Sequence, residues 1–164
     1  MSQKIASYDR FSDDLRDAMR IANRFAKAMR SREIETPHLL YALIKEPTGL
    51  AGHLLRCQGL SAKEIKRSVT RPDASQRQFT IFGKLPLSQN GWGYINDAID
   101  HAIGERHDSV GTAGLLRVMI LQAPQVIDIL TNLNVPLSDF EKDVAKYLHR
   151  HMVENPGEPL YFDS

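Results

Sequence analysis

The chain has 164 residues, of which 42% are hydrophobic, so it can bury the core of one compact domain or of two small ones. Its 21 Lys and Arg residues nearly balance 20 Asp and Glu residues, and a net charge of +1 excludes the overall field that favours nucleic acid or anionic membranes. With one cysteine, no signal-peptide run and no apolar stretch of membrane-spanning length, a cytoplasmic protein that binds neither nucleic acid nor membrane is expected.

The first helix is predicted to begin after Ser12, whose side chain can accept a hydrogen bond from a free backbone N–H. Apolar residues then recur at three- and four-residue spacing, which predicts an amphipathic helix of about five turns. They are Leu15, Ala18, Met19, Ala22, Phe25, Ala26 and Met29. A second helix is expected to open at Thr36 and Pro37, with the threonine as cap and the proline at the first helical position.

Two shorter helices follow. Residues 50–55 supply an apolar face that Gly59 can terminate, and Ser61 and Glu64 have the spacing of a capping box that starts the fourth helix. Helical periodicity stops over residues 71–87, which contain prolines together with large apolar side chains. We interpret this stretch as a linker that packs onto the domain.

The second half of the sequence repeats the first. When the chain is shifted by 76 positions, Ser12 falls on Ser88 and Thr36 falls on Thr112; one deletion then changes the offset to 75. A second Ser-x-x-Glu box, which begins at Ser138, follows in the second half as the box at Ser61 does in the first. Chance matches between amphipathic helices would not reproduce caps, helices and breaks in the same order.

The duplication predicts an all-α fold, in which two four-helix repeats related by a pseudo-two-fold axis form one compact domain of eight helices. The expected boundaries are an N-terminal extension (1–9), a first repeat (10–70), the linker (71–87), a second repeat (88–151) and a C-terminal tail (152–164). Residues 1–72 carry 14 basic and 8 acidic residues, and residues 73–164 carry 7 and 12, so the halves have charges of +6 and −5.

Residues 34–44 (Ile-Glu-Thr-Pro-His-Leu-Leu-x-Ala-Leu-Ile) and 110–116 (Val-Gly-Thr-Ala-Gly-Leu-Leu) resemble the double Clp repeat, the N-terminal domain of the Clp chaperone ATPases ClpA, ClpB and ClpC. The resemblance covers about residues 10 to 148. It implies a non-catalytic protein-interaction domain that binds adaptors or client proteins for a Clp-type ATP-dependent chaperone or protease. The alternative is a free-standing accessory or regulatory subunit that docks on a Clp protease core.

Partners implied by the resemblance are therefore protein clients or adaptors and Clp ATPase or protease subunits. In the ClpC branch, glutamates that follow the threonine of each repeat help to bind phosphorylated arginine. Pro37 and Ala113 occupy those positions here, so phosphoarginine binding is not expected. The backbone N–H groups at the helix starts, Thr36 and Thr112, can still attract an anion.

Two other groups of residues are candidates for protein or peptide binding. Arg16, Arg20 and Arg24 recur every four residues on one helix face and could dock an acidic partner; alternatively they are an ordinary solvated face. The linker residues Phe79, Ile81, Phe82 and Leu85 could hold an unfolded segment if they are exposed, or seal the seam between the repeats if they are buried.

The sequence contains no phosphate-binding loop, no nucleophile motif and no metal-ligand spacing, so we predict no catalytic residue, no metal site and no cofactor. A rival enzyme hypothesis would need a pocket with converging titratable groups, and burial of His38 among aliphatic residues would count against it.

Overall fold

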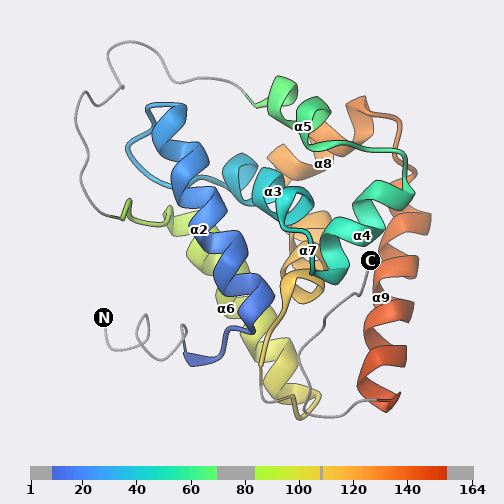
Figure 1. Cartoon of the computed structure of the whole chain (residues 1–164). Helices are drawn as coiled ribbons and strands as arrows, with labels where there is room; N and C mark the ends of the chain where they lie inside the picture. Colours follow the sequence, from blue (N-terminus) through green and yellow to red (C-terminus); the bar gives the residue numbers. More distant parts are fainter. Residues whose placement is uncertain (1–8, 70–83, 108, 155–164) are drawn as a thin grey trace.

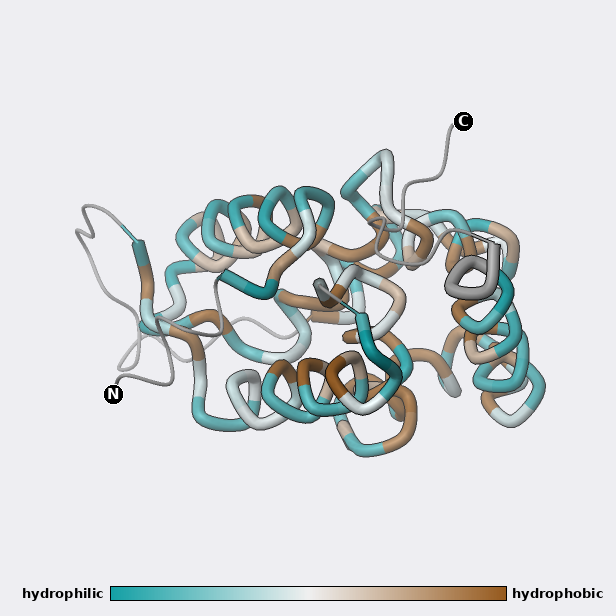
Figure 2. The backbone as a smooth tube through the Cα atoms, turned by 90° about the horizontal axis from the view of Figure 1, so that it is seen from below, coloured by the Kyte–Doolittle hydropathy of each residue, from teal (hydrophilic) through white to brown (hydrophobic). Residues whose placement is uncertain are grey.

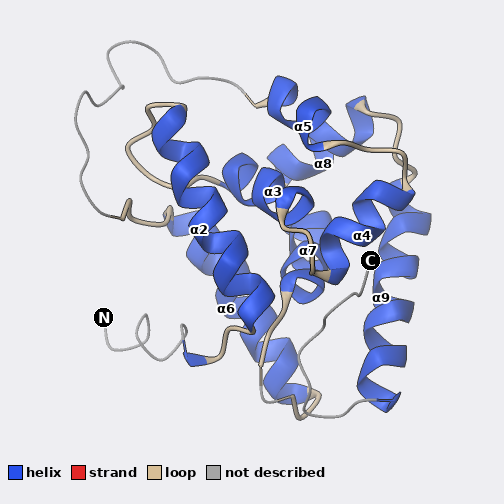
Figure 3. Cartoon of the chain, in the orientation of Figure 1, coloured by secondary structure: helices blue, strands red, loops and turns tan. Residues whose placement is uncertain are grey.

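The computed structural model describes residues 9–69, 84–107 and 109–154, and within these ranges the chain folds into helices joined by loops (Figures 1 and 3). The helices are α2 (Asp13–Ala28), α3 (Thr36–Lys45), α4 (Leu50–Cys57), α5 (Ala62–Ser68), α6 (Gln89–Gly104), α7 (Thr112–Gln122), α8 (Pro124–Asn132) and α9 (Leu137–Glu154). These eight helices confirm the predicted all-α fold of two four-helix units.

Serine caps start three of these helices, as predicted. The hydroxyl oxygens of Ser12, Ser61 and Ser88 each accept a hydrogen bond from the backbone N–H three residues further on, at 3.4, 3.2 and 3.0 Å. The prediction of a cap at Ser138 is wrong. Helix α9 already begins at Leu137, so Ser138 lies inside its first turn.

The predicted threonine caps are each displaced by one residue. Helix α3 is capped by Glu35, whose N–H donates to Nδ1 of His38 at 2.9 Å, and helix α7 is capped by Gly111. Thr36 and Thr112 are therefore the first residues of their helices, and both are buried. The imidazole thus accepts from the N–H of the cap residue itself, which is the reciprocal bond of a capping box.

The pseudo-two-fold relation appears in two isolated parallel β-bridges between the repeats. Phe11 pairs with Val110 and Ile34 pairs with Leu87, and the offset of 76 exchanges the two pairs because 11 + 76 = 87 and 34 + 76 = 110. Their hydrogen bonds match as well: the N–H of Ser12 donates to the carbonyl of Val110 and the N–H of Ser88 to that of Ile34, both at 2.9 Å.

Backbone conformation at the helix ends follows the same relation. The residues with positive φ in the described ranges are Arg30 and Arg106, at 58° and 63°, together with Gly59 and Asn134, at 82° and 64°. The first pair is separated by 76 positions and the second by 75. Each closes a helix with a left-handed residue, the common way of ending an α-helix. Gly59 thus terminates α4 as predicted.

Helices α3 and α7 lie at the centre of the domain (Figure 1). Helix α3 packs against α2, α4 and α5, α7 packs against α6, α8 and α9, and the repeats meet where α4 contacts α7 and α8 contacts α3. Seven of the eleven residues of α7 are buried, so this helix is covered on most sides. Hydrophobic and hydrophilic residues alternate along the helices in Figure 2, as expected for helices with one buried face.

Within the described residues, no single helix combines the length and the apolar content needed to cross a bilayer. Helices α7 and α8 reach that threshold only when taken together, and the pair is bent by 90°.

Candidate functional site

A groove of about 550 Å³ opens beside helix α2. It lies within the size range of ligand pockets in proteins. The described residues that line it come from three parts of the chain, namely Arg16, Met19, Arg20, Asn23 and Arg24 of α2, Ile34 of the following loop, and Lys84 and Leu85 of the segment that leads into α6.

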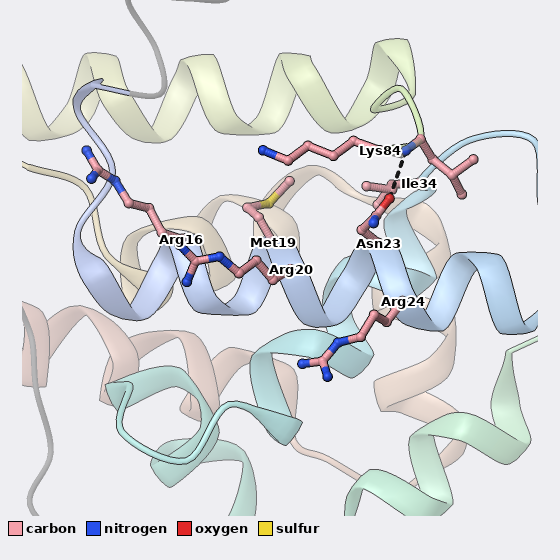
Figure 4. Close-up of a pocket in the computed structure, with 8 residues that line it drawn as sticks. Arg16, Met19, Arg20, Asn23, Arg24, Ile34 and Lys84 are labelled. Atoms are coloured by element: carbon pink, nitrogen blue, oxygen red, sulfur yellow. Dashed lines mark hydrogen bonds between the residues drawn. The ribbon is translucent and has the colours of Figure 1, made fainter. Parts of the chain in front are cut away.

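The first repeat and the end of the linker build this groove, because two contacts hold the segment before α6 against the first repeat. The side-chain oxygen of Asn23 accepts a hydrogen bond from the backbone N–H of Leu85 at 2.8 Å (Figure 4). The bridge between Ile34 and Leu87 fixes the same segment two residues further on. Two residues separated by 62 positions in sequence are thereby joined across the groove.

The groove has an apolar floor and a basic rim. Met19, Ile34 and Leu85 are buried, whereas the arginine side chains and Lys84 are exposed. Figure 4 shows that the arginines come from successive turns of α2 and that Lys84 reaches in from the segment before α6. Arg20 pairs with Asp17 at 2.5 Å, and its side chain is still 69% exposed. An apolar floor with a polar rim is the general build of a surface that binds another protein.

Two of the predicted binding groups therefore meet at one place. Arg16, Arg20 and Arg24 line the same groove as Leu85, which is buried in its floor rather than displayed. The remaining linker candidates, Phe79, Ile81 and Phe82, lie outside the described residues.

Four lining residues were not among the predicted binding residues: Met19, Asn23, Ile34 and Lys84. Met19 and Asn23 share the α2 face with the arginines, so helical periodicity contained a signal for them. The contribution of Ile34 and Lys84 depends on the bridge between the repeats, which no local pattern reveals.

The first residue of α7 is hydrogen-bonded to a carboxyl group of the first repeat, that of Asp14. Asp14 of the first repeat accepts two hydrogen bonds at Oδ2, from the hydroxyl of Thr112 at 3.0 Å and from its backbone N–H at 3.3 Å. The Thr112 hydroxyl oxygen accepts a further bond from the N–H of Ala51 at 3.2 Å. A carboxylate here is favoured by the positive end of the α7 dipole.

Burial raises the pKa of Asp14, while hydrogen bonds from Ser12 and Thr112 lower it and the negative charge of Glu46 raises it further. Glu46 is also buried, and its carboxylate accepts hydrogen bonds from the N–H groups of Thr48, at 3.1 Å, and Gly49, at 2.5 Å. Among the residues that the structure describes, no three His, Cys, Asp or Glu side chains gather as potential metal ligands.

The start of α3 differs from that of α7. Asn90 occupies the position equivalent to Asp14, since 14 + 76 = 90, and it is exposed. Anion binding at Thr36 stays a prediction, and Thr112 has its N–H already bonded to Asp14.

His38 is buried against aromatic side chains and does not face the groove residues. Its ring meets that of Phe25 edge-on, with centroids 5.5 Å apart, and Phe25 in turn stacks on Tyr41. Burial lowers the pKa of His38 to about 4, which keeps the imidazole neutral near pH 7. His38 is thus buried, as the argument against the rival enzyme hypothesis requires, but its ring neighbours are aromatic and not aliphatic.

The chain is similar to known proteins in sequence and in fold. Residues 10–83 match the model of the family described as Clp repeat (R) N-terminal domain. The chain is 23% identical over 150 residues to a "Probable ATP-dependent Clp protease ATP-binding subunit" of Chlamydia pneumoniae, an alignment that covers 91% of this chain and 18% of that protein. The chain thus spans less than a fifth of the length of this relative.

Solved structures agree with the fold. The N-terminal domain of the caseinolytic protease associated chaperone ClpD from Arabidopsis thaliana has a TM-score of 0.70 and 17% identity, covering 85% of this chain and 95% of that one. The N-domain of ClpV in complex with a VipB peptide has a TM-score of 0.63 and 13% identity, covering 93% and 91%. At these identities the likeness establishes the fold.

Proposed function

We propose that this chain is a member of the Clp repeat N-terminal domain family, whose model residues 10–83 match, and that it binds adaptor or client proteins for a Clp-type ATP-dependent chaperone or protease. The observation that supports this proposal most directly is the groove beside α2, which is lined by the first repeat and the end of the linker and combines an apolar floor with a charged rim. The proposed role of this domain is binding rather than ATP-driven work.

The solved complex of a ClpV N-domain with a VipB peptide supports a peptide-binding role for a domain of this fold. In the present chain, Met19, Ile34 and Leu85 form the floor of the groove and are 6%, 4% and 6% exposed, so a side chain of a bound segment would contact the small apolar area that they leave open. Non-directional apolar contact suits a domain that receives clients of different sequence, because shape and burial matter more than a fixed hydrogen-bond pattern.

A photo-crosslinking pull-down tests this proposal. The crosslinking amino acid benzoylphenylalanine replaces exposed Arg20 in the groove, and a matched control carries it at Tyr147, which is 40% exposed on α9. We expect crosslinks to a Clp subunit, an adaptor or a misfolded client from the groove position, with and without ATP, and fewer from α9. Recovery of none of these classes would contradict the proposed function, and equal recovery from both positions would remove the groove from it.

A further inference from the structure

The two repeats have similar backbones, but their side chains differ at the positions that line the groove. The pseudo-two-fold offset of 76 maps the three arginines of α2 onto α6, where the equivalent residues are Trp92, Asn96 and Asp100. None of these is basic. The fold itself therefore does not require a row of arginines on the first helix of a repeat.

Two further groove positions also differ between the repeats. Ile99 stands in the position of Asn23 and Val110 in that of Ile34, and both are buried. An asparagine at position 23 holds the segment before α6, whereas Ile99 is part of the hydrophobic core. The row of arginines and the asparagine bond to the segment before α6 are thus features of the first repeat, and the second repeat does not share them.

The charge of the open groove has one sign. Its eight described lining residues include four cations, Arg16, Arg20, Arg24 and Lys84, and no acidic residue. Asp17 beside the groove offsets part of this charge through its pair with Arg20. Since the whole chain has a net charge of only +1, the positive charge of the groove is local.

We infer that the groove takes an acidic segment of a partner protein, with carboxylates about 6 Å apart on either side of an apolar anchor residue. The inference rests on the proposed function and adds the chemistry of the ligand. Residues four apart on a helix rise about 6 Å, so the arginine row of α2 matches carboxylates at i and i+4 of a partner helix, or at i and i+2 of an extended strand. The anchor residue would lie on Met19, Ile34 and Leu85.

A random dodecamer peptide library displayed on phage, selected on the immobilised full chain, tests the inference. We expect the enriched peptides to carry at least two Asp or Glu residues around a large apolar one. Each enriched peptide is then made with a fluorescent label, alone and with Glu→Gln and Asp→Asn replacements, and its binding is measured by fluorescence anisotropy. The neutral versions should bind about tenfold more weakly, and binding of the acidic versions should weaken as salt is raised.

A charge-reversed protein and a matched control complete the test. Arg20→Glu combined with Arg24→Glu changes two exposed groove positions, and Lys142→Glu combined with Lys146→Glu makes the same change on the exposed face of α9. Circular dichroism confirms that both variants are folded. We expect the groove variant to lose at least about tenfold in affinity for acidic peptides and the α9 variant to keep the wild-type affinity.

The outcomes separate the inference from the proposed function. The enriched peptides could instead carry no excess of acidic residues, compete for the groove and bind both variants equally. This result would overturn the inference of an acidic ligand and leave peptide binding in place. Failure of the selection to enrich any peptide, together with no groove crosslink, would overturn both.

Discussion

Protonation of His38 should destabilise the fold as the pH falls below neutral. The imidazole is 2% exposed, and burial lowers its pKa from 6.5 to about 4, so the unfolded chain binds this proton before the folded one does. The stabilisation from the neutral imidazole is therefore complete above about pH 6.5 and is lost progressively between pH 6.5 and 4. Asp14 acts in the opposite direction, because its raised pKa lets the folded state bind a proton first.

The size of this destabilisation follows from the difference between the pKa values of His38 in the unfolded and the folded chain. At 1.36 kcal/mol for each pKa unit, a drop from 6.5 to about 4 corresponds to about 3 kcal/mol at full protonation, and to about 2 kcal/mol at pH 5. The group is buried, so solvent screening does not reduce this figure much. Domains of this size have free energies of unfolding of about 5–15 kcal/mol, so the change is measurable.

The assay is urea unfolding followed by circular dichroism at several pH values between 8 and 5, for the wild type and for His38→Gln. A glutamine at this position can still accept the hydrogen bond from the N–H of Glu35 but does not titrate. Comparison of the two chains at each pH cancels the contribution of Asp14. We expect the wild type to lose about 2 kcal/mol more than His38→Gln between pH 8 and 5.

His101→Gln, at an exposed position of α6, controls for the loss of a histidine. If the free energies of the wild type and His38→Gln fall in parallel over this range, His38 is not a buried neutral imidazole, and the argument from burial is refuted.

Three further substitutions, with Gly93→Ala as a control, test the junction and the helix ends by urea unfolding at pH 7. Asp14→Ala should lower the free energy of unfolding by about 2–4 kcal/mol, because it leaves the buried N–H and hydroxyl of Thr112 without their acceptor; a loss below about 0.5 kcal/mol would contradict this. Gly49→Ala should lower the free energy of unfolding, since the new Cβ would lie 2.5 Å from Thr112 Oγ1. Gly93→Ala, on an exposed turn of α6 with nothing within 4 Å of the new Cβ, should raise it by about 0.5–1 kcal/mol. Equal effects of the two substitutions would count against the close approach at Gly49. Gly59→Ala should cost about 1 kcal/mol because φ is 82° there, and an unchanged unfolding midpoint would refute the left-handed helix end.

Local patterns in the sequence determined most of the fold. Serine caps, three- and four-residue apolar spacing and the glycine after α4 act over a few residues, so the sequence alone predicts the helices that they delimit. The duplication extended this local information over the whole chain, because two weak signals at a constant separation support each other. The four-helix repeats and their pseudo-two-fold relation could be predicted for this reason.

The sequence misled at the two threonine helix starts, for a distant reason at α7 and a local one at α3. Thr112 has a favourable type and spacing for a helix cap, but its hydroxyl is bonded to Asp14, 98 residues away in sequence. At α3 the imidazole of His38 accepts from the N–H of Glu35, three residues earlier, and Glu35 is the cap residue. Caps compete with tertiary hydrogen bonds of similar energy, so propensity alone does not decide between them.

For the candidate site, the sequence determined the ingredients, namely a row of arginines on one face of α2 and an apolar Leu85 before α6. Only the tertiary structure decided that they line one groove. That arrangement depends on the bond from Leu85 to Asn23 and on the bridge between Ile34 and Leu87, both of which join residues more than fifty positions apart. Periodicity reports which face of a helix is buried, but it carries no information on which distant segment covers that face or leaves it open.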